Sequence, residues 1–152
     1  MISQKTRYAL KALMLLAKDE KAKKGPILIS ELARRGKMPQ KFLEAILLEL
    51  KNQGVLASKK GKGGGYSLAM PAQEIMLGDV IRAFEGPLAL VPCATPQHRG
   101  CEECRDDETF GIRILFKEVR DATAKILDGT SLEKVRHVQS QVSEQKKQMY
   151  FI

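Results

Sequence analysis

The sequence has 152 residues, of which 43% are hydrophobic and 29% are charged, as in an ordinary globular protein with room for a buried core. No stretch comes near 18 consecutive apolar residues, which argues against a transmembrane helix. Lys11 interrupts the apolar stretch 9–17, and three cysteines are an odd number for a disulfide framework. We therefore expect a cytoplasmic protein with no leader peptide and no membrane partner.

The net charge of +8 is concentrated in the first half of the chain. Residues 1–66 carry 15 Lys and Arg against 5 Asp and Glu, whereas residues 67–152 carry 11 against 13. Such asymmetry is typical of a protein whose cationic half meets a nucleic acid or an anionic membrane surface.

Three helices are predicted in this cationic half. Apolar residues recur at helical spacing in 3–18, Ser30 can cap a short helix over 30–35, and a strong helical pattern runs over 39–52 until Gly54 stops it. In this third helix Phe42, Ile46 and Leu50 fall four residues apart, and Leu43 and Leu47 lie beside them. Two helices joined by a short turn, with the second one stronger, form a helix-turn-helix pattern.

The segment 56–68 follows at once and places four glycines and three lysines between two strand-like stretches. Glycine permits positive φ and close approach of a partner, and the lysines Lys59, Lys60 and Lys62 make the tip cationic. We interpret the segment as the wing of a winged helix that contacts DNA phosphates. The alternative is a nucleotide-phosphate loop, which requires glycines that lead into a helix, whereas these lead into a strand.

The helix over 39–52 carries Gln40, Lys41 and Glu44 on the outward face of its first turns. Helix-turn-helix proteins insert this end into the major groove, where these side chains can pair with adenine, guanine and cytosine. The alternative is a solvated helix face on an ordinary bundle. The wing and the charge asymmetry favour the DNA interpretation.

Two further helices are predicted, over 75–85 and over 109–127. The second has an apolar stripe with the spacing that pairs a helix with another helix. The stripe consists of Ile112, Leu115, Val119, Ala122 and Ile126. Thr130 and Glu133 fit a capping box for one or two more helical turns, after which we expect a frayed tail with a last-turn anchor at 149–152.

The loop between these two helices contains Cys93, His98, Cys101 and Cys104 within 12 residues. Three thiolates and one imidazole can bind zinc or an iron–sulfur cluster. The alternative is a set of reduced thiols on a surface loop, or a redox-reactive pair. The spacing alone leaves both interpretations open.

Several motifs together resemble the Rrf2 family of bacterial transcription regulators, which includes IscR, NsrR and RirA, over about residues 1–132. They are ISQKTRYAL at 2–10, FLE at 42–44, GKGGGY at 61–66, GDVI at 78–81 and the cysteine loop before a long helix. The resemblance implies a mainly α fold with a small β-wing, namely a winged helix-turn-helix domain plus a long dimerisation helix. It also implies a homodimer that binds pseudo-palindromic, double-stranded promoter DNA, mostly as a repressor.

The resemblance further implies which residues contact DNA and which cofactor is a candidate. The implied DNA contacts are Gln40, Lys41 and Glu44, the wing around 60–64 with Gly63 and Gly64, and backbone contacts near Ser3 and Lys5.

The candidate cofactor is an iron–sulfur cluster in the cysteine loop, but the ligand pattern of the family is altered here. Phe110 stands where cluster-binding members have a third cysteine, Arg113 where IscR has a histidine, and Arg7 where NsrR has an acidic ligand. Cys93, Cys101 and Cys104 remain as candidate ligands, and His98, Glu102, Glu103 or Asp107 could complete a site.

We therefore expect a winged helix-turn-helix DNA-binding domain at 1–86, a cysteine loop at 87–108, a dimerisation region at 109–135 and a C-terminal tail at 136–152. The expected function is that of a dimeric, sequence-specific transcription regulator whose cysteine loop responds to iron–sulfur, redox or metal signals. The alternative is a metal or redox module whose main role is not DNA binding. The sequence contains no catalytic set that favours an enzyme.

Overall fold

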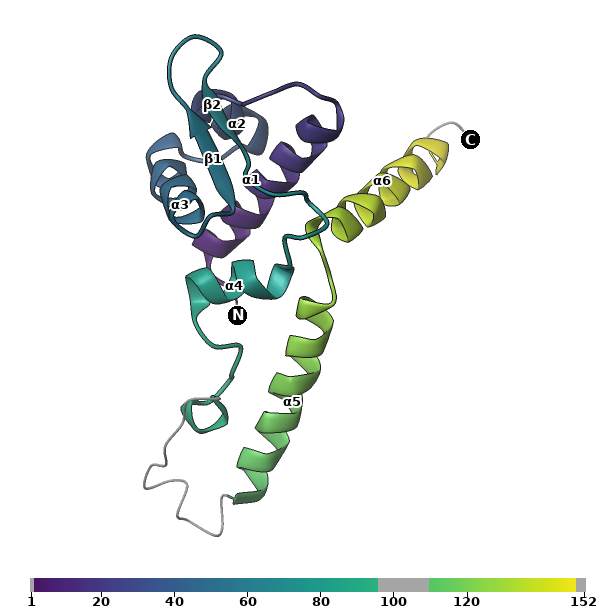
Figure 1. The fold of residues 1–152 in the computed structure, drawn as a ribbon. Helices are drawn as coiled ribbons and strands as arrows, with labels where there is room; N and C mark the ends of the chain where they lie inside the picture. The colour runs from purple at the N-terminus through teal and green to yellow at the C-terminus, as the bar shows by residue number, and fades with distance from the viewer. Residues whose placement is uncertain (1, 96–109, 150–152) are drawn as a thin grey trace.

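The structure is a computed structural model that describes residues 2–95 and 110–149. The described chain is mainly helical with one two-stranded wing, as predicted (Figure 1). In chain order the elements are α1 (Gln4–Lys21), α2 (Ile29–Gly36), α3 (Gln40–Asn52), β1 (Leu56–Lys59), β2 (Gly65–Leu68), α4 (Leu77–Glu85), the short 3₁₀ turn η1 (Pro92–Ala94), α5 (Phe110–Asp128) and α6 (Leu132–Met149). No helix within the described ranges combines the length and the apolar content needed to cross a membrane.

One hydrophobic core joins α1, α2, α3, the wing and the residues that flank α4. From α3 it takes Leu43, Ile46, Leu47 and Leu50, all fully buried, and α3 packs directly on α1. Burying each such side chain stabilises the fold by about 1.5–3 kcal/mol, so this face fixes the orientation of α3.

Phe42 shares the four-residue spacing of the buried residues of α3 but is itself partly exposed. Its side chain is 42% exposed and its ring meets the edge of Tyr8 at a centroid distance of 5.8 Å. The four-residue spacing placed Phe42 with Ile46 and Leu50, but the buried face is centred on Leu43, Ile46 and Leu47, which leaves Phe42 at its margin.

Two of the predicted helix caps are wrong by one or two residues. The N-cap of α2 is Leu28, and Ser30 lies exposed in the first turn. The cause is a long-range backbone pairing, because the amide and carbonyl of Ile27 both bond Tyr66 at 2.8 Å and place the start of α2 directly after that bridge. At α6 the cap is Ser131, whose Oγ accepts from the amide of Lys134.

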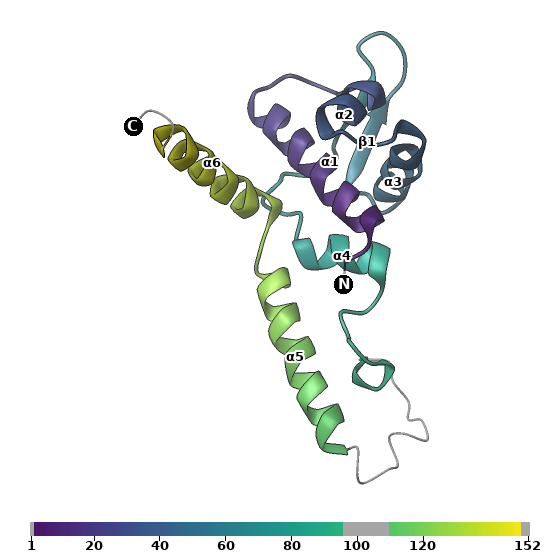
Figure 2. The same cartoon turned by 180° about the vertical axis from the view of Figure 1, so that it is seen from behind.

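The last helix, α6, corrects the expectation of one or two helical turns followed by a frayed tail. It continues to Met149, and its first turns lie against α1, with Leu132 fully buried in the common core. From there α6 runs on in much the same direction as α1 (Figure 2), and an open groove between the two helices is lined by Leu15 and Lys18 on one side and by Gln139 and Ser143 on the other. Its Gln- and Lys-rich composition favours helix, which the apolar periodicity alone did not reveal. Residues 150–152 of the expected anchor lie outside the described residues.

The end of α1 is tied to α2 by a buried ion pair between Asp19 and Arg35. Two hydrogen bonds join them, from Nη1 to Oδ2 at 2.6 Å and from Nη2 to Oδ1 at 2.9 Å. Asp19 is 5% exposed, and the hydrogen bond from Arg35 holds the pKa of its carboxyl below the ordinary value. A carboxyl whose pKa is lower in the folded state stabilises that state above its unfolded pKa, and this contribution is lost as the pH falls through the folded pKa.

We predict that Asp19→Asn destabilises the fold by about 2–3 kcal/mol at pH 7, because it leaves a partly buried guanidinium without its counter-charge. The difference from wild type should start to shrink below about pH 4, where the carboxyl of the unfolded chain begins to be protonated, and it should vanish as the pH falls through the lower pKa of the folded carboxyl. Urea unfolding at a series of pH values measures both effects. Glu31→Gln, which removes the partner of Arg34 on the exposed face of α2, is the matched control and should change little. If the difference in free energy of unfolding between wild type and Asp19→Asn stayed constant down to about pH 2, the proposed link between Asp19 ionisation and stability would be wrong.

Candidate nucleic-acid interface

The outward face of α3 carries the three side chains that were predicted from the sequence to contact DNA bases. Gln40, Lys41 and Glu44 are all exposed in the first turns of the helix, on the side away from the buried leucines. Within the described ranges no ion pair engages Lys41 or Glu44. The face is therefore polar, held rigidly by the core behind it, and free to meet a partner.

The turn between α2 and α3 adds an exposed cation that sequence reasoning missed. Lys37 takes a left-handed conformation with φ of 50°, and the amide of Met38 returns to the carbonyl of Ala33 at 2.9 Å. The buried side chain of Met38 closes the turn beneath it, so Lys37 points to solvent. The signal in the sequence was the Gly36-Lys37 step, where a helix commonly ends in a left-handed residue.

The wing is a tight antiparallel hairpin whose glycines have a steric function. Leu56 pairs with Leu68 and Lys59 with Gly65 at the two ends of the ladder. A Cβ on Gly64 would lie 2.4 Å from the carbonyl oxygen of Lys59, and one on Gly65, where φ is +139°, would lie 2.4 Å from that of Ile27. Larger side chains would therefore force both the turn and its docking on the chain before α2 to move.

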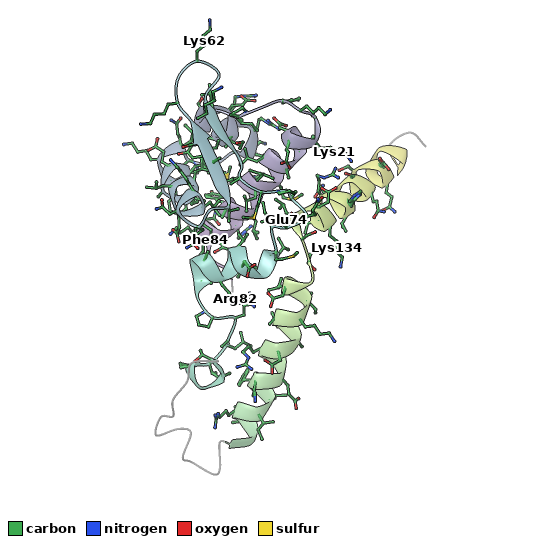
Figure 3. The ribbon with its side chains drawn as sticks, in the orientation of Figure 1. Lys21, Lys62, Glu74, Arg82, Phe84 and Lys134 are labelled. Carbon is green, nitrogen blue, oxygen red and sulfur yellow. The ribbon has the colours of Figure 1, made fainter. Side chains whose placement is uncertain are left out.

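The wing presents its cations to solvent. Lys59, Lys60 and Lys62 are exposed, and no carboxylate of the described residues pairs with them. Figure 3 shows the side chain of Lys62 at the tip of the hairpin, pointing away from the body of the protein. Gly63 is exposed beside it, whereas Gly64 is buried in the turn.

Ser3 and Lys5, two further predicted DNA contacts, make internal contacts in this structure. The ammonium of Lys5 lies 2.5 Å from Glu49 of α3 and 5.1 Å from the ring centre of Phe84 of α4. Ser3 caps α1, and its amide donates to Glu85 of α4 at 2.8 Å. These contacts join α1, α3 and α4, and a DNA contact by either residue stays a prediction.

Glu85 receives its bonds from α1 as an ionised group. The hydroxyl of fully buried Thr6 donates to it together with Ser3, and these hydrogen bonds, that from Ser3 first, lower the pKa of Glu85. The carboxylate therefore fixes the start of α1 against the end of α4.

The predicted metal ligands fall mostly outside the described residues. His98, Cys101 and Cys104 lie in that part of the chain together with Glu102, Glu103 and Asp107, and of Cys93 only the backbone, in η1, is described. In residues 2–95 and 110–149 no group of three or more His, Cys, Asp or Glu is arranged to hold a metal. The metal site therefore stays a prediction.

The apolar stripe of α5 is exposed. Leu115 is 57% and Ile126 is 68% exposed, and Ile112, Val119 and Ala122 are open to solvent between and beyond them. The neighbouring face of α5 packs on α4 and η1, where Arg120 donates to the carbonyl of Ala94. An uncovered row of this length is typical of a surface that binds another protein chain.

The sequence matches a known protein family and several of its members. The family model described as Rrf2, iron-dependent transcriptional regulator, matches residues 2–137. An rrf2-like HTH-type transcriptional regulator of Rhodobacter capsulatus is 40% identical over 136 residues, which cover 88% of this chain and 90% of the relative. The HTH-type transcriptional regulator CymR of Bacillus subtilis is 33% identical over 99% of both chains.

A solved structure of CymR from B. subtilis, described as the global cysteine regulator, has the same fold. It superimposes with a TM-score of 0.74 and covers 91% of this chain and 97% of its own. The predicted resemblance and winged-helix fold are thereby confirmed.

Proposed function

The chain belongs to the Rrf2 family of HTH-type transcriptional regulators, and we propose that it acts in the cytoplasm as a homodimeric repressor on pseudo-palindromic promoter DNA. The observation that supports this most is the exposed polar face of α3 beside the cationic, glycine-rich wing. One rigid body thus offers a helix for base edges and a hairpin for phosphates.

In the proposed complex, the start of α3 enters the major groove. Gln40, Lys41 and Glu44 reach base edges there, whereas Lys59, Lys60 and Lys62 with the backbone at Gly63 and Gly64 contact the sugar-phosphate chain. Contacts to phosphate position the protein and release counterions, so they set affinity and its dependence on salt but not sequence preference.

In the proposed homodimer, the stripe of α5 packs against its counterpart in a second copy. Covering its large aliphatic side chains removes apolar surface from water, with about 25 cal/mol gained for each Å². Two copies related by a two-fold axis would present two α3 helices to two half-sites, which explains why the expected operator is a palindrome.

The function is tested by selecting bound DNA from a random duplex pool at two salt concentrations. A two-fold symmetric consensus, with an affinity that falls steeply as salt rises, supports a dimeric regulator. An absence of enrichment at low salt would defeat the DNA-binding proposal and favour the metal or redox module. Repression itself is tested by transcription in vitro from a promoter that carries the selected site.

We predict that Glu44→Ala changes which base is preferred at one position of each half-site, by about tenfold, because one base-edge contact is worth about 1–3 kcal/mol. In contrast, Lys60→Ala should weaken binding to all sequences alike and reduce the salt slope by about one unit. Affinities for the consensus and its single-base variants measure both. An unchanged base preference in Glu44→Ala would remove this residue from the readout.

We predict that Leu115→Glu produces a monomer, because it places a charge within the apolar stripe of the proposed α5 interface. Sedimentation should show the mass fall from twice 16.9 kDa to 16.9 kDa. Lys117→Glu introduces the same side chain at an exposed position roughly 200° round the helix and is the control, which should stay dimeric. If Leu115→Glu stayed dimeric with normal helicity, another surface would hold the copies together.

We propose that the regulator senses its signal through the thiols of the cysteine loop, in preference to a conventional iron–sulfur cluster. The observation that favours thiols lies in the first turn of α5, where Phe110 and Arg113 occupy the positions that the family resemblance assigns to ligands. A phenyl ring and a guanidinium cation do not bind iron. Cys93, Cys101 and Cys104 are left as thiols whose reactivity depends on their pKa and exposure.

We predict that the protein purified without oxygen is colourless and free of iron, and that mild oxidation of its thiols changes its affinity for the selected DNA. Visible absorption, iron analysis and DNA titration before and after oxidation test this. A brown protein that holds stoichiometric iron and loses it in Cys104→Ser would overturn the expectation and restore the cluster.

A further inference from the structure

The helix α5, which we call the arm, meets the rest of the described chain, which we call the body, through a compact contact on α4. We call this contact the joint. At its centre, Arg82 of α4 holds Asp128 at the end of α5 through two parallel hydrogen bonds, Nη1 to Oδ1 at 2.8 Å and Nη2 to Oδ2 at 2.7 Å. The same guanidinium lies 3.3 Å from Asp79, one turn earlier on α4. The hydrogen bond from Arg82 lowers the pKa of Asp128, so the pair is ionic at neutral pH.

Gly78 makes this geometry possible. It is buried on the face of α4 that meets α5, and a Cβ at this position would lie 1.9 Å from Oδ1 of Asp128 and 3.0 Å from Nη1 of Arg82. The carboxylate therefore occupies the space of the missing side chain. Because glycine has a lower helix propensity than alanine, its presence in the first turn of α4 is explained by the close approach and not by helix formation.

The main chain secures the position of the joint but leaves its angle to the side chains. The amide of Leu77 donates to Thr130 at 3.0 Å, that of Leu132 donates to Ile75 at 2.8 Å, and Met76 bridges Ser131. These bonds all act on the link directly after α5. The helix itself projects from the body (Figure 1). The bidentate pair joins its last turn to the side of α4, and Arg120, near its middle, donates to the carbonyl of Ala94 in η1.

Small changes of angle at this joint are amplified along the arm. A 19-residue helix is about 28 Å long, so a tilt of about 10° moves its far end by about 5 Å. The rise per base pair is about 3.4 Å. When two arms pack together, a change in the angle between α4 and α5 turns each body relative to the paired arms and so alters how far apart the two reading helices lie.

We propose that the joint of Gly78, Arg82 and Asp128 sets the half-site spacing that this regulator accepts on DNA. The inference rests on the proposed dimer and its DNA binding. It assigns to Arg82 and Asp128 a positioning role in specificity, since neither is on the reading face of α3 nor on the wing.

The test uses the full-length protein and its selected consensus, with the half-sites moved together or apart by one and two base pairs at a fixed salt concentration. Asp128→Asn removes the ionic link, and Gly78→Ala displaces the carboxylate while keeping both charges. Asp79→Asn is the matched control, because it takes an acid from the same arginine without cutting the bond between α4 and α5.

We expect both joint variants to lose at least about fivefold of the discrimination between the native and the shifted spacings, which corresponds to about 1 kcal/mol. Their affinity for a single half-site should equal that of wild type, and Asp79→Asn should keep the wild-type spacing profile. A wild-type profile in dimeric, helical Asp128→Asn would overturn the proposal. So would a loss of affinity that is equal at every spacing. If Gly78→Ala does not fold, Asp128→Asn alone decides.

Small-angle X-ray scattering of the dimers without DNA separates this proposal from the proposed function. A longer or broader distribution of interatomic distances in Asp128→Asn and Gly78→Ala, but not in Asp79→Asn, supports the joint even if no operator were found. Unchanged scattering from both joint variants would defeat it even if DNA binding were established.

Discussion

The burial of one face of α3 against α1 determines how the rest of the molecule is used. Leu43, Leu47 and Leu50 give α3 a single permitted orientation, and the polar positions between them must then face solvent. The same packing positions the wing, because the amide of Val55 bonds back to Leu50 at 2.9 Å and β1 begins one residue later. The face of α3 and the wing therefore belong to one rigid unit.

In the long helix α5, too, the packing of one face determines which side chains are left exposed, but here the exposed side chains are aliphatic. One face of α5 is half-buried against α4 and η1, and a second face of aliphatic residues is left to solvent. The exposed amide, ammonium and carboxylate groups on α3 are favourably hydrated, whereas exposing a continuous row of aliphatic side chains to water is unfavourable in free energy. The two outward faces thus differ in the partner they suit: a hydrated polyanion for α3 and another apolar surface for α5.

Periodicity predicted those elements whose stability comes from one buried face, and it failed where contacts between distant residues decide. The helices α1, α3, α4 and α5 and the hairpin were all predicted within a few residues, and so was the exposure of Gln40, Lys41 and Glu44. The caps at Ser30 and Thr130 failed because pairing of Ile27 with Tyr66, and of Ser131 with Met76, fixes where those helices begin. Local capping preferences of about 1 kcal/mol do not outweigh such pairing together with the core behind it.

The ion pairs of Lys5 with Glu49 and of Arg82 with Asp128 were equally invisible to sequence patterns, since 44 and 46 residues separate their members. Both involve the surroundings of α4. This helix carries Phe84 and Glu85 against the first turn of α1 on one side and holds the arm through Arg82 on the other. It also ends at Gly86, where the segment that leads to the cysteines begins.

The closeness of this segment to the DNA-binding elements does not by itself couple the cysteine loop to α3. Coupling requires an element with two arrangements of similar free energy. Rearranging a half-exposed ion pair such as that of Arg82 with Asp128 costs less free energy than rearranging the closely packed core, and a change of angle there is amplified along α5.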